Sequence, residues 1–464
     1  MRFARTGALL GVALLWWAVG PLALVLAAAA LCSPRVREWL RPTRRVLGWW
    51  VVGVLAVAGV LYVLPDGWVR LPPGPGALVT PAYVGRPSIL PAGEVAAPLG
   101  DSPQVTTRSY GAPDCRDVGF DPRGRLVTTC GDVLRLVDPD SLRQLAAKDL
   151  PGGCPPVFTV AGGRVLVVAG GRVLTVATAD AEGAPDLTTS AAVDLPEGGC
   201  ATGVGVDRRN RTWVSTEDGR VALVVGDRVR LLDLHDRVRR PLTIAPDAVY
   251  VAGEHALHKV IATGDRPVAA WAARSDGVER GSAPVVLPSG LVAVADDRDP
   301  RLQVVVHRGD TGAVACRLEL FDDDESSTDG GLVAADDGLL VLNQHGYDGP
   351  LSTALGRTTT GGLARVDVPR CRVSWQSDLD APSGAPAVSP EAGLAYLYTK
   401  RHSWLGADAW YLTAVDLRSG RTTWAQRTGL GVLADNHHGS VALGPDGAAY
   451  VPVLGGFVRV ADRS

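Results

Sequence analysis

A short segment that combines an apolar run with a turn recurs about every 50 residues in the C-terminal part of the chain. Its four clear copies lie at 283–290, 331–338, 385–393 and 440–447, and each copy ends in Gly. A repeat of this length indicates supersecondary units that pack on one another, as in a solenoid or a propeller. The repeat therefore limits the class of fold before any single residue is considered.

Runs of five or six residues rich in Val, Leu and Ala alternate with these turns, and Gly, Pro or Asp lies at or near their ends. Six such runs lie at 164–168, 172–176, 290–294, 338–342, 393–397 and 448–453. This pattern predicts β-strands, and 55 Gly with 33 Pro favour turns over long helices. No amphipathic helix pattern of comparable length competes, so the domain is predicted to be all-β.

The number of repeats follows from the length that they occupy. Residues 112–464 hold about eight units of roughly 44 residues, which is the size of a propeller blade. We therefore expect an eight-bladed β-propeller, with seven blades as the alternative. The last unit, 431–464, has room for only three strands, so a strand at about residues 103–110 is expected to complete it and close the ring.

Two uncharged apolar runs precede this domain, at 7–31 and 46–64. Each is long enough to cross a hydrocarbon core as a helix, so they predict a two-helix transmembrane hairpin. The alternative is a cleaved signal peptide or lipoprotein signal, since four Ala precede Cys32 by one residue. The first run is longer than a signal core and Leu31 is bulky, so Cys32 is interpreted as an ordinary thiol.

Charge on either side of these runs predicts the topology. The loop 32–45 carries five Arg and one Glu, whereas the N-terminal tail carries Arg2 and Arg5. Positive residues in short loops stay cytoplasmic, so the loop is expected inside and the domain outside the cytoplasmic membrane. Residues 65–111 hold a dense series of prolines and are expected to form an extended linker that holds the domain off the membrane.

Net charge separates the same two parts of the chain. Residues 1–64 carry seven Arg and one Glu, so the total of −3 leaves −9 for the remainder. An acidic domain repels a phosphate backbone, and no basic stripe with aromatic residues is present. Nucleic acid is therefore not an expected partner.

Six cysteines lie in the domain that is placed outside the cytosol, where disulfides form. Cys115 and Cys130 flank the turn 121–124 symmetrically, so a hairpin at that turn sets them opposite one another. Cys154 and Cys200 each follow a Gly-Gly pair, which suggests a second bridge and leaves Cys316 with Cys371 as the third. Unpaired buried thiols are the alternative, because connectivity is not readable from sequence.

The segment 414–424, Ala-Val-Asp-Leu-Arg-Ser-Gly-Arg-Thr-Thr-Trp, resembles the repeat of quinoprotein-like (PQQ-like) propellers, a family that includes the assembly scaffold BamB. Asp416, Gly420 and Trp424 match its Asp, Gly and Trp positions, and Asp367 with Trp375 repeats the spacing. The resemblance implies that the tryptophans pack between blades and serve the fold. It does not imply bound PQQ, since adjacent cysteines and a Cys-x-x-Cys-His haem motif are absent.

Five polar loops supply the candidate site. Segments 296–299, 343–348 and 400–404 each follow the second strand of a blade, and 322–325 and 435–438 each precede a first strand. Because strands alternate in direction within a blade, all five are expected on one rim of blades 5–8. The candidate residues are Asp296, Asp299, Asp322, Asp324, Asn343, His345, Tyr347, Asp348, His402, Trp404, Asp435, Asn436, His437 and His438.

Two functions are compatible with these features. The first is a non-enzymatic membrane-anchored propeller that binds or scaffolds a protein, peptide or carbohydrate ligand outside the cytoplasm. The second is a quinoprotein-type oxidoreductase or a hydrolase that uses a divalent metal such as calcium at the rim. The enzyme requires carboxylates and imidazoles from at least three blades within metal-ligand distance, whereas solvated loops would support the binding module.

Overall fold

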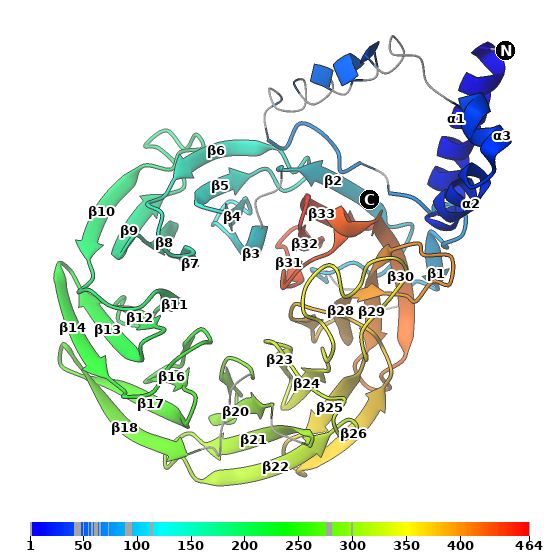
Figure 1. The fold of residues 1–464 in the computed structure, drawn as a ribbon. Coiled ribbons are helices and arrows are strands. Elements are labelled where there is room, and N and C mark those ends of the chain that lie inside the picture. The colour runs from blue at the N-terminus through cyan, green and yellow to red at the C-terminus, as the bar shows by residue number, and fades with distance from the viewer. Residues whose placement is uncertain are drawn as a thin grey trace.

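The computed structural model describes residues 2–40, 48–49, 51–53, 55–56, 59, 64, 66–72, 74–88, 95–111, 115–274, 281–297 and 300–463. Within these residues, eight antiparallel sheets are arranged in a ring (Figure 1). The prediction of an all-β propeller with eight blades is therefore confirmed, and the seven-bladed alternative is excluded.

The blades follow one another in chain order, each running from an innermost to an outermost strand. Blade 1 is β3 (Cys115–Phe120), β4 (Leu126–Cys130), β5 (Val133–Val137) and β6 (Gln144–Asp149). Blade 2 is β7 (Val157–Ala161), β8 (Arg164–Ala169), β9 (Arg172–Ala177) and β10 (Thr189–Asp194). Blade 3 is β11 (Ala201–Val206), β12 (Thr212–Thr216), β13 (Arg220–Val225) and β14 (Arg228–Asp233). Blade 4 is β15 (Thr243–Ile244), β16 (Val249–Ala252), β17 (Ala256–Thr263) and β18 (Arg266–Arg274).

The second half of the ring contains the four clear repeats. Blade 5 is β19 (Val285–Val286), β20 (Leu291–Asp296), β21 (Leu302–Arg308) and β22 (Val314–Leu320). Blade 6 is β23 (Leu332–Ala335), β24 (Gly338–Leu342), β25 (Leu363–Asp367) and β26 (Arg372–Ser377). Blade 7 is β27 (Ala387–Ser389), β28 (Leu394–Lys400), β29 (Ala409–Asp416), β30 (Thr422–Leu430) and a fifth strand, β1 (Tyr83–Gly85). Blade 8 is β31 (Ala442–Leu443), β32 (Ala449–Val453), β33 (Gly456–Ala461) and β2 (Gln104–Ser109), with a 3₁₀ turn at Val432–Ala434 before it.

Burial explains why the strand signal is clearest in the middle of each blade. The middle strands β4 and β24 are buried at every residue, because both faces pack against neighbouring blades. Such strands are continuous apolar runs, which the sequence shows directly. The outermost strand β6 alternates between half-buried and exposed residues, as expected for a strand with one wet face.

The ring is closed by strands from both ends of the domain. β2, at the position expected for the closing strand, pairs with β33 from Gln104 opposite Ala461 to Ser109 opposite Gly456. Blade 8 thus takes three strands from the C-terminus and one from the N-terminal side. The pairing leaves no open gap between the first and last units.

Tryptophans on outer strands pack against glycines in the neighbouring blade. Trp375 on β26 lies against Gly420 in the turn between β29 and β30, and its Nε1 donates to the Leu417 carbonyl at 3.0 Å. Trp271 on β18 lies in the same way against Gly312 of blade 5. Gly420 has φ of +72°, and a Cβ there would come within 2.5 Å of the indole, so both the turn and the contact require glycine.

The aspartates of the same segments cap these turns. Asp416 Oδ1 accepts hydrogen bonds from the Ser419 backbone N–H at 2.7 Å and from its hydroxyl at 2.6 Å. Asp367 Oδ1 accepts from the Arg370 N–H at 3.1 Å in the equivalent turn of blade 6. An aspartate that bonds its own backbone three residues on fixes the turn geometry. The segment around Gly420 therefore acts in blade-to-blade packing.

All three predicted disulfides are present: Cys115–Cys130, Cys154–Cys200 and Cys316–Cys371. The first joins paired positions of β3 and β4 within blade 1. The second joins the loops that lead into blades 2 and 3, and the third joins β22 of blade 5 to the turn before β26 of blade 6. Two of the three bridges therefore link neighbouring blades.

The first apolar run differs from the single helix that the sequence predicts at 7–31. It forms α1 (Arg2–Val19) and α2 (Leu22–Leu31), followed by α3 (Pro34–Leu40). Gly20 adopts φ of +105° and Pro21 offers no N–H, so the helix breaks between them. In the part of the chain that is described, no helix has both the length and the apolar character to cross a bilayer. Loop residues 41–45 lie wholly outside the described residues, and so does about half of the second run at 46–64.

The proline-rich segment is also different from the stiff spacer that the sequence predicts. β1 pairs with β30, and the Arg427 side chain donates to the carbonyls of Ala77 at 2.9 Å and Thr80 at 2.6 Å. Extended proline-rich backbone leaves its carbonyls free, and buried tyrosine hydroxyls use them: Tyr411 donates to Pro81 and Tyr396 to Pro98. Much of the segment is therefore part of the surface of blades 7 and 8.

Candidate functional site

The loops that lead into the innermost strands meet at one end of the central channel. They line a cavity of about 440 Å³, which we call the channel mouth. Its lining comes from six of the eight blades: Arg116 of blade 1, Arg240 and Pro241 of blade 4, Ala283 of blade 5, Asp329 and Gly330 of blade 6, Gly384 and Ala385 of blade 7, and His437, His438 and Ser440 of blade 8. A site built from so many separate chain segments exists only when the ring is closed.

A charged cluster lies at the channel mouth. Asp329 Oδ2 is 3.0 Å from His438 Nδ1, and its other carboxylate oxygen pairs with the Arg240 guanidinium. Burial acts to raise the pKa of Asp329, but the His438 hydrogen bond and the Arg240 charge outweigh it and hold the pKa well below its ordinary value. Asp329 is therefore an anion that fixes a guanidinium and an imidazole in place.

A second polar cluster lies beside the first. Asp435 is fully buried and accepts hydrogen bonds from the Tyr347 hydroxyl at 2.9 Å, the Thr353 hydroxyl at 2.9 Å and the His437 backbone N–H at 2.8 Å. The Tyr347 oxygen is also 3.1 Å from His437 Nδ1. Burial raises the pKa of Asp435 above its ordinary value. The cluster joins the long loop 343–362 of blade 6 to the loop that leads into blade 8.

Two predicted asparagines brace the loops instead of facing a ligand. Asn343 donates to the Glu325 carbonyl at 2.9 Å and accepts from the Ser327 N–H at 3.0 Å. Asn436 donates to the carbonyls of Ser383 at 2.9 Å and Gly439 at 2.7 Å. Both side chains are buried, so their amides replace water as partners for the loop backbone. The channel mouth is consequently held in a defined shape.

The other predicted residues do not join the channel mouth. Asp296 is buried at the end of β20, beside a small cavity between blades 4 and 5. Asp322, Asp324 and Asp348 are exposed, and His345 is half-buried. His402 is also exposed, and its ring packs edge-on against that of Trp404, with 4.6 Å between the ring centroids. Asp299 lies outside the described residues. Tyr347, Asp435, His437 and His438 therefore lie together around the mouth, whereas Asp296, His345 and the exposed candidates lie apart from it.

The metal-dependent enzyme requires a set of ligands that the described residues do not assemble. Among them, no group of three or more His, Cys, Asp or Glu side chains could hold a metal ion. His437 and His438 lie together, with ring centroids 4.8 Å apart, but the neighbouring carboxylates are engaged with Arg240, Tyr347 and Thr353. The residues of the mouth do not fit a calcium site, which needs six to eight oxygen ligands.

Sequence reasoning missed Arg240 and Asp329. Each lies in a loop that leads into an innermost strand: Arg240 precedes β15 and Asp329 precedes β23. His437 and His438 occupy the same position before β31 of blade 8. The predicted site consists of runs of polar residues, whereas Arg240 and Asp329 are single charged residues within Arg-Arg-Pro and Thr-Asp-Gly-Gly. Aligning the loops of all eight units on their innermost strands would have found them.

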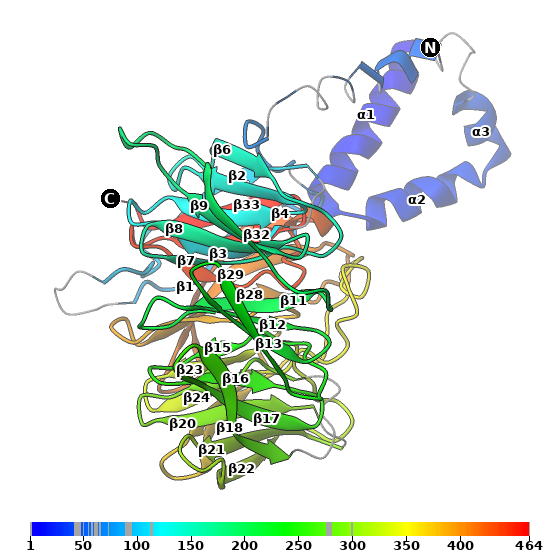
Figure 2. The same cartoon turned by 90° about the vertical axis from the view of Figure 1, so that its left-hand side faces the viewer.

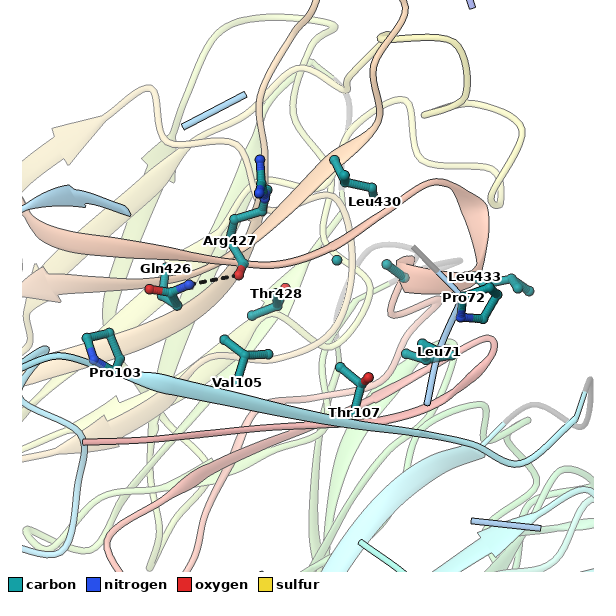
Figure 3. Close-up of a pocket in the computed structure, with 12 residues that line it drawn as sticks. Leu71, Pro72, Pro103, Val105, Thr107, Gln426, Arg427, Thr428, Leu430 and Leu433 are labelled. Atoms are coloured by element: carbon teal, nitrogen blue, oxygen red, sulfur yellow. Dashed lines mark hydrogen bonds between the residues drawn. The ribbon is translucent and has the colours of Figure 1, made fainter. Parts of the chain in front are cut away.

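A second cavity, of about 350 Å³, lies between the outer strands of blades 7 and 8 (Figure 3). Val105 and Thr107 of β2 form one side, Thr428 and Leu430 of β30 the other, and Leu71 covers one end. Two of its polar groups are already engaged: the Arg427 guanidinium binds the proline-rich segment and the Thr428 hydroxyl contacts Tyr398. The cavity therefore offers apolar surface and no reactive group.

A buried charged cluster anchors the long loop 343–362 to blade 7. Lys400 Nζ is 3.0 Å from Asp408 Oδ1 and also donates to the Arg357 carbonyl. Asp408 accepts the backbone N–H of Leu355 at 3.1 Å and of Gly356 at 2.7 Å. Asp380 lies beside them and accepts from the Thr359 hydroxyl at 2.7 Å. The cluster holds the loop that carries Tyr347 to the mouth.

Asp380 should make the stability of the protein depend on pH. Burial raises its pKa to about 7, so the folded protein keeps a proton that the unfolded chain releases near pH 4. Between these values the free energy of unfolding should fall with rising pH by up to about 1.4 kcal/mol per pH unit. Urea unfolding of Asp380→Asn from pH 4.5 to 7.5 should show a flatter profile, and the exposed Asp348→Asn should keep the original slope. Equal slopes for Asp380→Asn and the unmodified chain would contradict the assignment.

No protein-family model and no curated protein sequence matches the chain. Among solved structures it is similar to the Dos1 propeller, with a TM-score of 0.56 and 10% identity over 79% of this chain and 95% of that one. BamB from Moraxella catarrhalis gives a TM-score of 0.43 and 14% identity over 65% of this chain and 95% of that one. Streptogramin B lyase gives a TM-score of 0.43 and 10% identity over 77% of this chain and 97% of that one. The chain is an eight-bladed β-propeller with a polar mouth at one end of its central channel.

Proposed function

We propose that the chain is a membrane-attached propeller that binds a protein partner at its channel mouth and acts as a binding or scaffolding module. The observation that carries this proposal is the mouth itself, a cavity of about 440 Å³ lined by six blades. Ligand sites in proteins typically occupy about 300–1,000 Å³ and combine a shaped surface with a few fixed polar groups. The braced loops around Asn343 and Asn436 meet that description.

Charge at the mouth favours an anionic group on the partner. Two guanidinium groups, Arg116 and Arg240, and two imidazoles, His437 and His438, line it together with a single carboxylate, Asp329. Asp329 is engaged with Arg240 and His438, and basic side chains outnumber acidic ones in the lining. An acidic side chain or loop of a protein partner would complement it, and such complementarity speeds and orients binding.

The location outside the cytoplasm is part of the same proposal. Three disulfides, two of them between blades, support an oxidising compartment. Membrane attachment is supported by apolar side chains that α1 and α2 leave exposed, among them Leu9, Leu10, Leu14, Leu24 and Leu26. Helices that are apolar on most sides are stable only when something apolar covers them.

The blade contacts support a place among PQQ-like propellers. Trp375 on Gly420, with Asp416 capping the turn, is the arrangement that the resemblance of 414–424 implies. Trp271 of blade 4 packs against Gly312 of blade 5 in the same way, although the segment that holds Trp271 lacks the motif. These residues stabilise the fold and leave the mouth free for binding.

Photocrosslinking in the native membrane tests the proposed ligand face. A photoreactive residue at Ala385, in the lining of the mouth, should form an adduct with a protein partner. The same residue at Pro246, in the turn between β15 and β16 on the opposite face, should not. Arg240→Ala should reduce the Ala385 adduct by about fivefold or more, because the guanidinium is a main part of the positive lining.

The matched control is Arg228→Ala on the outermost strand of blade 3, which removes an exposed Arg away from the mouth and should leave the adduct unchanged. Thermal unfolding of each variant shows whether the ring is intact. Equal adduct yields at Ala385 and Pro246, or an adduct that is insensitive to Arg240→Ala in a folded variant, would overturn the proposal.

A further inference from the structure

Large apolar side chains are exposed at the tips of two neighbouring loops. Leu351 and Leu355, in the loop 343–362 of blade 6, are 78% and 65% exposed. Trp404, in the loop 401–408 of blade 7, is 93% exposed. Scattered exposed aliphatic residues are ordinary, but a contiguous group with a tryptophan marks an interaction surface. We call these three side chains the apolar tips.

The two loops are fixed to one another, so the apolar tips form one surface. The Ser403 N–H donates to the Gly356 carbonyl at 2.9 Å, and Gly356 packs against Ser403 and Gly406 so closely that no Cβ would fit. Asp408 adds hydrogen bonds to the backbone of Leu355 and Gly356. The tips are therefore preorganised by backbone contacts.

The same surface continues into the start of α2. Pro21 lies against Gly406, and Gly20 lies against Leu405 and Ala407 of the loop that carries Trp404. Figure 2 shows α1 and α2 projecting from the side of the ring that carries the loops of blades 6 and 7. Beyond Pro21, α2 exposes Leu22, Leu24, Val25 and Leu26. The apolar tips and the apolar helices thus lie next to each other on one face.

We infer that Leu351, Leu355 and Trp404 dock the rim of blades 6 and 7 into the headgroup region of a lipid bilayer. This inference rests on the proposed membrane attachment through α1 and α2. Tryptophan suits a membrane interface because its ring is apolar and its N–H is polar. A bilayer is favoured over a protein partner here because the tips are continuous with helices that are apolar on most sides.

Charge beside the apolar tips fits the same occupant. Arg357 donates to the Leu351 carbonyl at 2.7 Å and remains exposed, and exposed Arg401 lies over the Tyr411 ring at 4.9 Å. Guanidinium groups at this level can bind lipid phosphates while the apolar tips enter the acyl boundary. The propeller would then contact the bilayer through the rim of blades 6 and 7.

The test uses the full chain reconstituted in liposomes of phosphatidylcholine and phosphatidylglycerol at 7:3. Cys32 is the free cysteine, so Cys32→Ser gives a background for single labels. Leu355→Cys, Trp404→Cys and, as the matched control, Leu231→Cys on β14 of blade 3 are each labelled with an environment-sensitive fluorophore. Labels at 355 and 404 should shift to shorter wavelength and be quenched by nitroxide lipids about twofold more than the label at 231.

Two outcomes would overturn the inference, and they separate it from the proposed attachment. If the chain floats with the liposomes while labels at 355 and 404 stay as exposed to water as the label at 231, docking fails and attachment stands. A protein occupant of the tips would give that same result, because the liposomes hold no partner. If the chain does not float with the liposomes, attachment fails as well.

Discussion

Trp424→Ala is expected to lower the free energy of unfolding by about 3–5 kcal/mol. The indole is fully buried between blades 7 and 8, with its ring centroid 6.2 Å from that of Tyr396. It fills the space above Gly100, whose φ of +87° excludes most other residues. Its neighbours belong to paired strands of two blades, so the cavity left by alanine cannot collapse.

The matched control is Trp404→Ala, which makes the same change at a side chain that is 93% exposed. It should alter stability by less than about 0.5 kcal/mol in urea unfolding without lipid. Both variants keep the disulfides, so the urea midpoint reports packing alone. A loss below about 1 kcal/mol for Trp424→Ala would show that blade 7 and blade 8 repack around the gap.

Lys400→Met should cost about 3–5 kcal/mol, because it leaves the Asp408 carboxylate in a buried site without its cation. The Lys400 side chain has no exposed surface, and burial lowers its pKa below the ordinary value. Asp408 and Asp380 both lie near the ammonium group. Methionine has a similar volume, so the loss measures charge more than packing.

Rescue distinguishes this cause from simple disruption. Lys400→Met combined with Asp408→Asn removes the unpaired carboxylate and should recover a measurable part of the loss. Lys148→Met on β6 makes the same substitution at a half-buried site on an outer strand and should have little effect. A double variant no more stable than Lys400→Met alone would contradict the electrostatic explanation. Urea unfolding at pH 7.5 gives the free energy of unfolding of these three variants and of the unmodified chain.

The sequence predicts the blades well because their main signal is local. The repeats at 283–290 and 440–447 hold the innermost strands β19 and β31 and the turns that follow them. The symmetry of Cys115 and Cys130 about the turn 121–124 likewise needs only one hairpin. A pattern that is complete within about 15 residues requires no knowledge of the rest of the fold.

The errors concern contacts between distant residues. Tyr83 of β1 pairs opposite Gln426, and the Leu99 N–H bonds to Asp462, each across more than 300 residues. Proline spacing describes the stiffness of the segment but not the carbonyl acceptors that attach it to blades 7 and 8. The single helix predicted at 7–31 is divided into α1 and α2 for a different reason, because a run of apolar residues hides the Gly20-Pro21 break.

The candidate site shows the same division. His437 and His438 stand out as neighbouring polar residues in one loop, and the structure places them at the mouth. Arg240 and Asp329 become partners only because blades 4 and 6 both face the channel, 89 residues apart along the chain. Side chains whose role depends on the closed ring have no local signal.

Because β2 and β33 come from opposite ends of the domain, synthesis order matters for this protein. A ribosome releases β2 more than 300 residues before its pairing partner exists, so the N-terminal strand must wait while seven other blades form. During that interval β2 lacks β33, its pairing partner in blade 8. An unpaired strand can form a sheet with another chain. Closure of the propeller ring is therefore the last step in forming this domain, and the growing chain passes through an open intermediate in which β2 has no pairing partner.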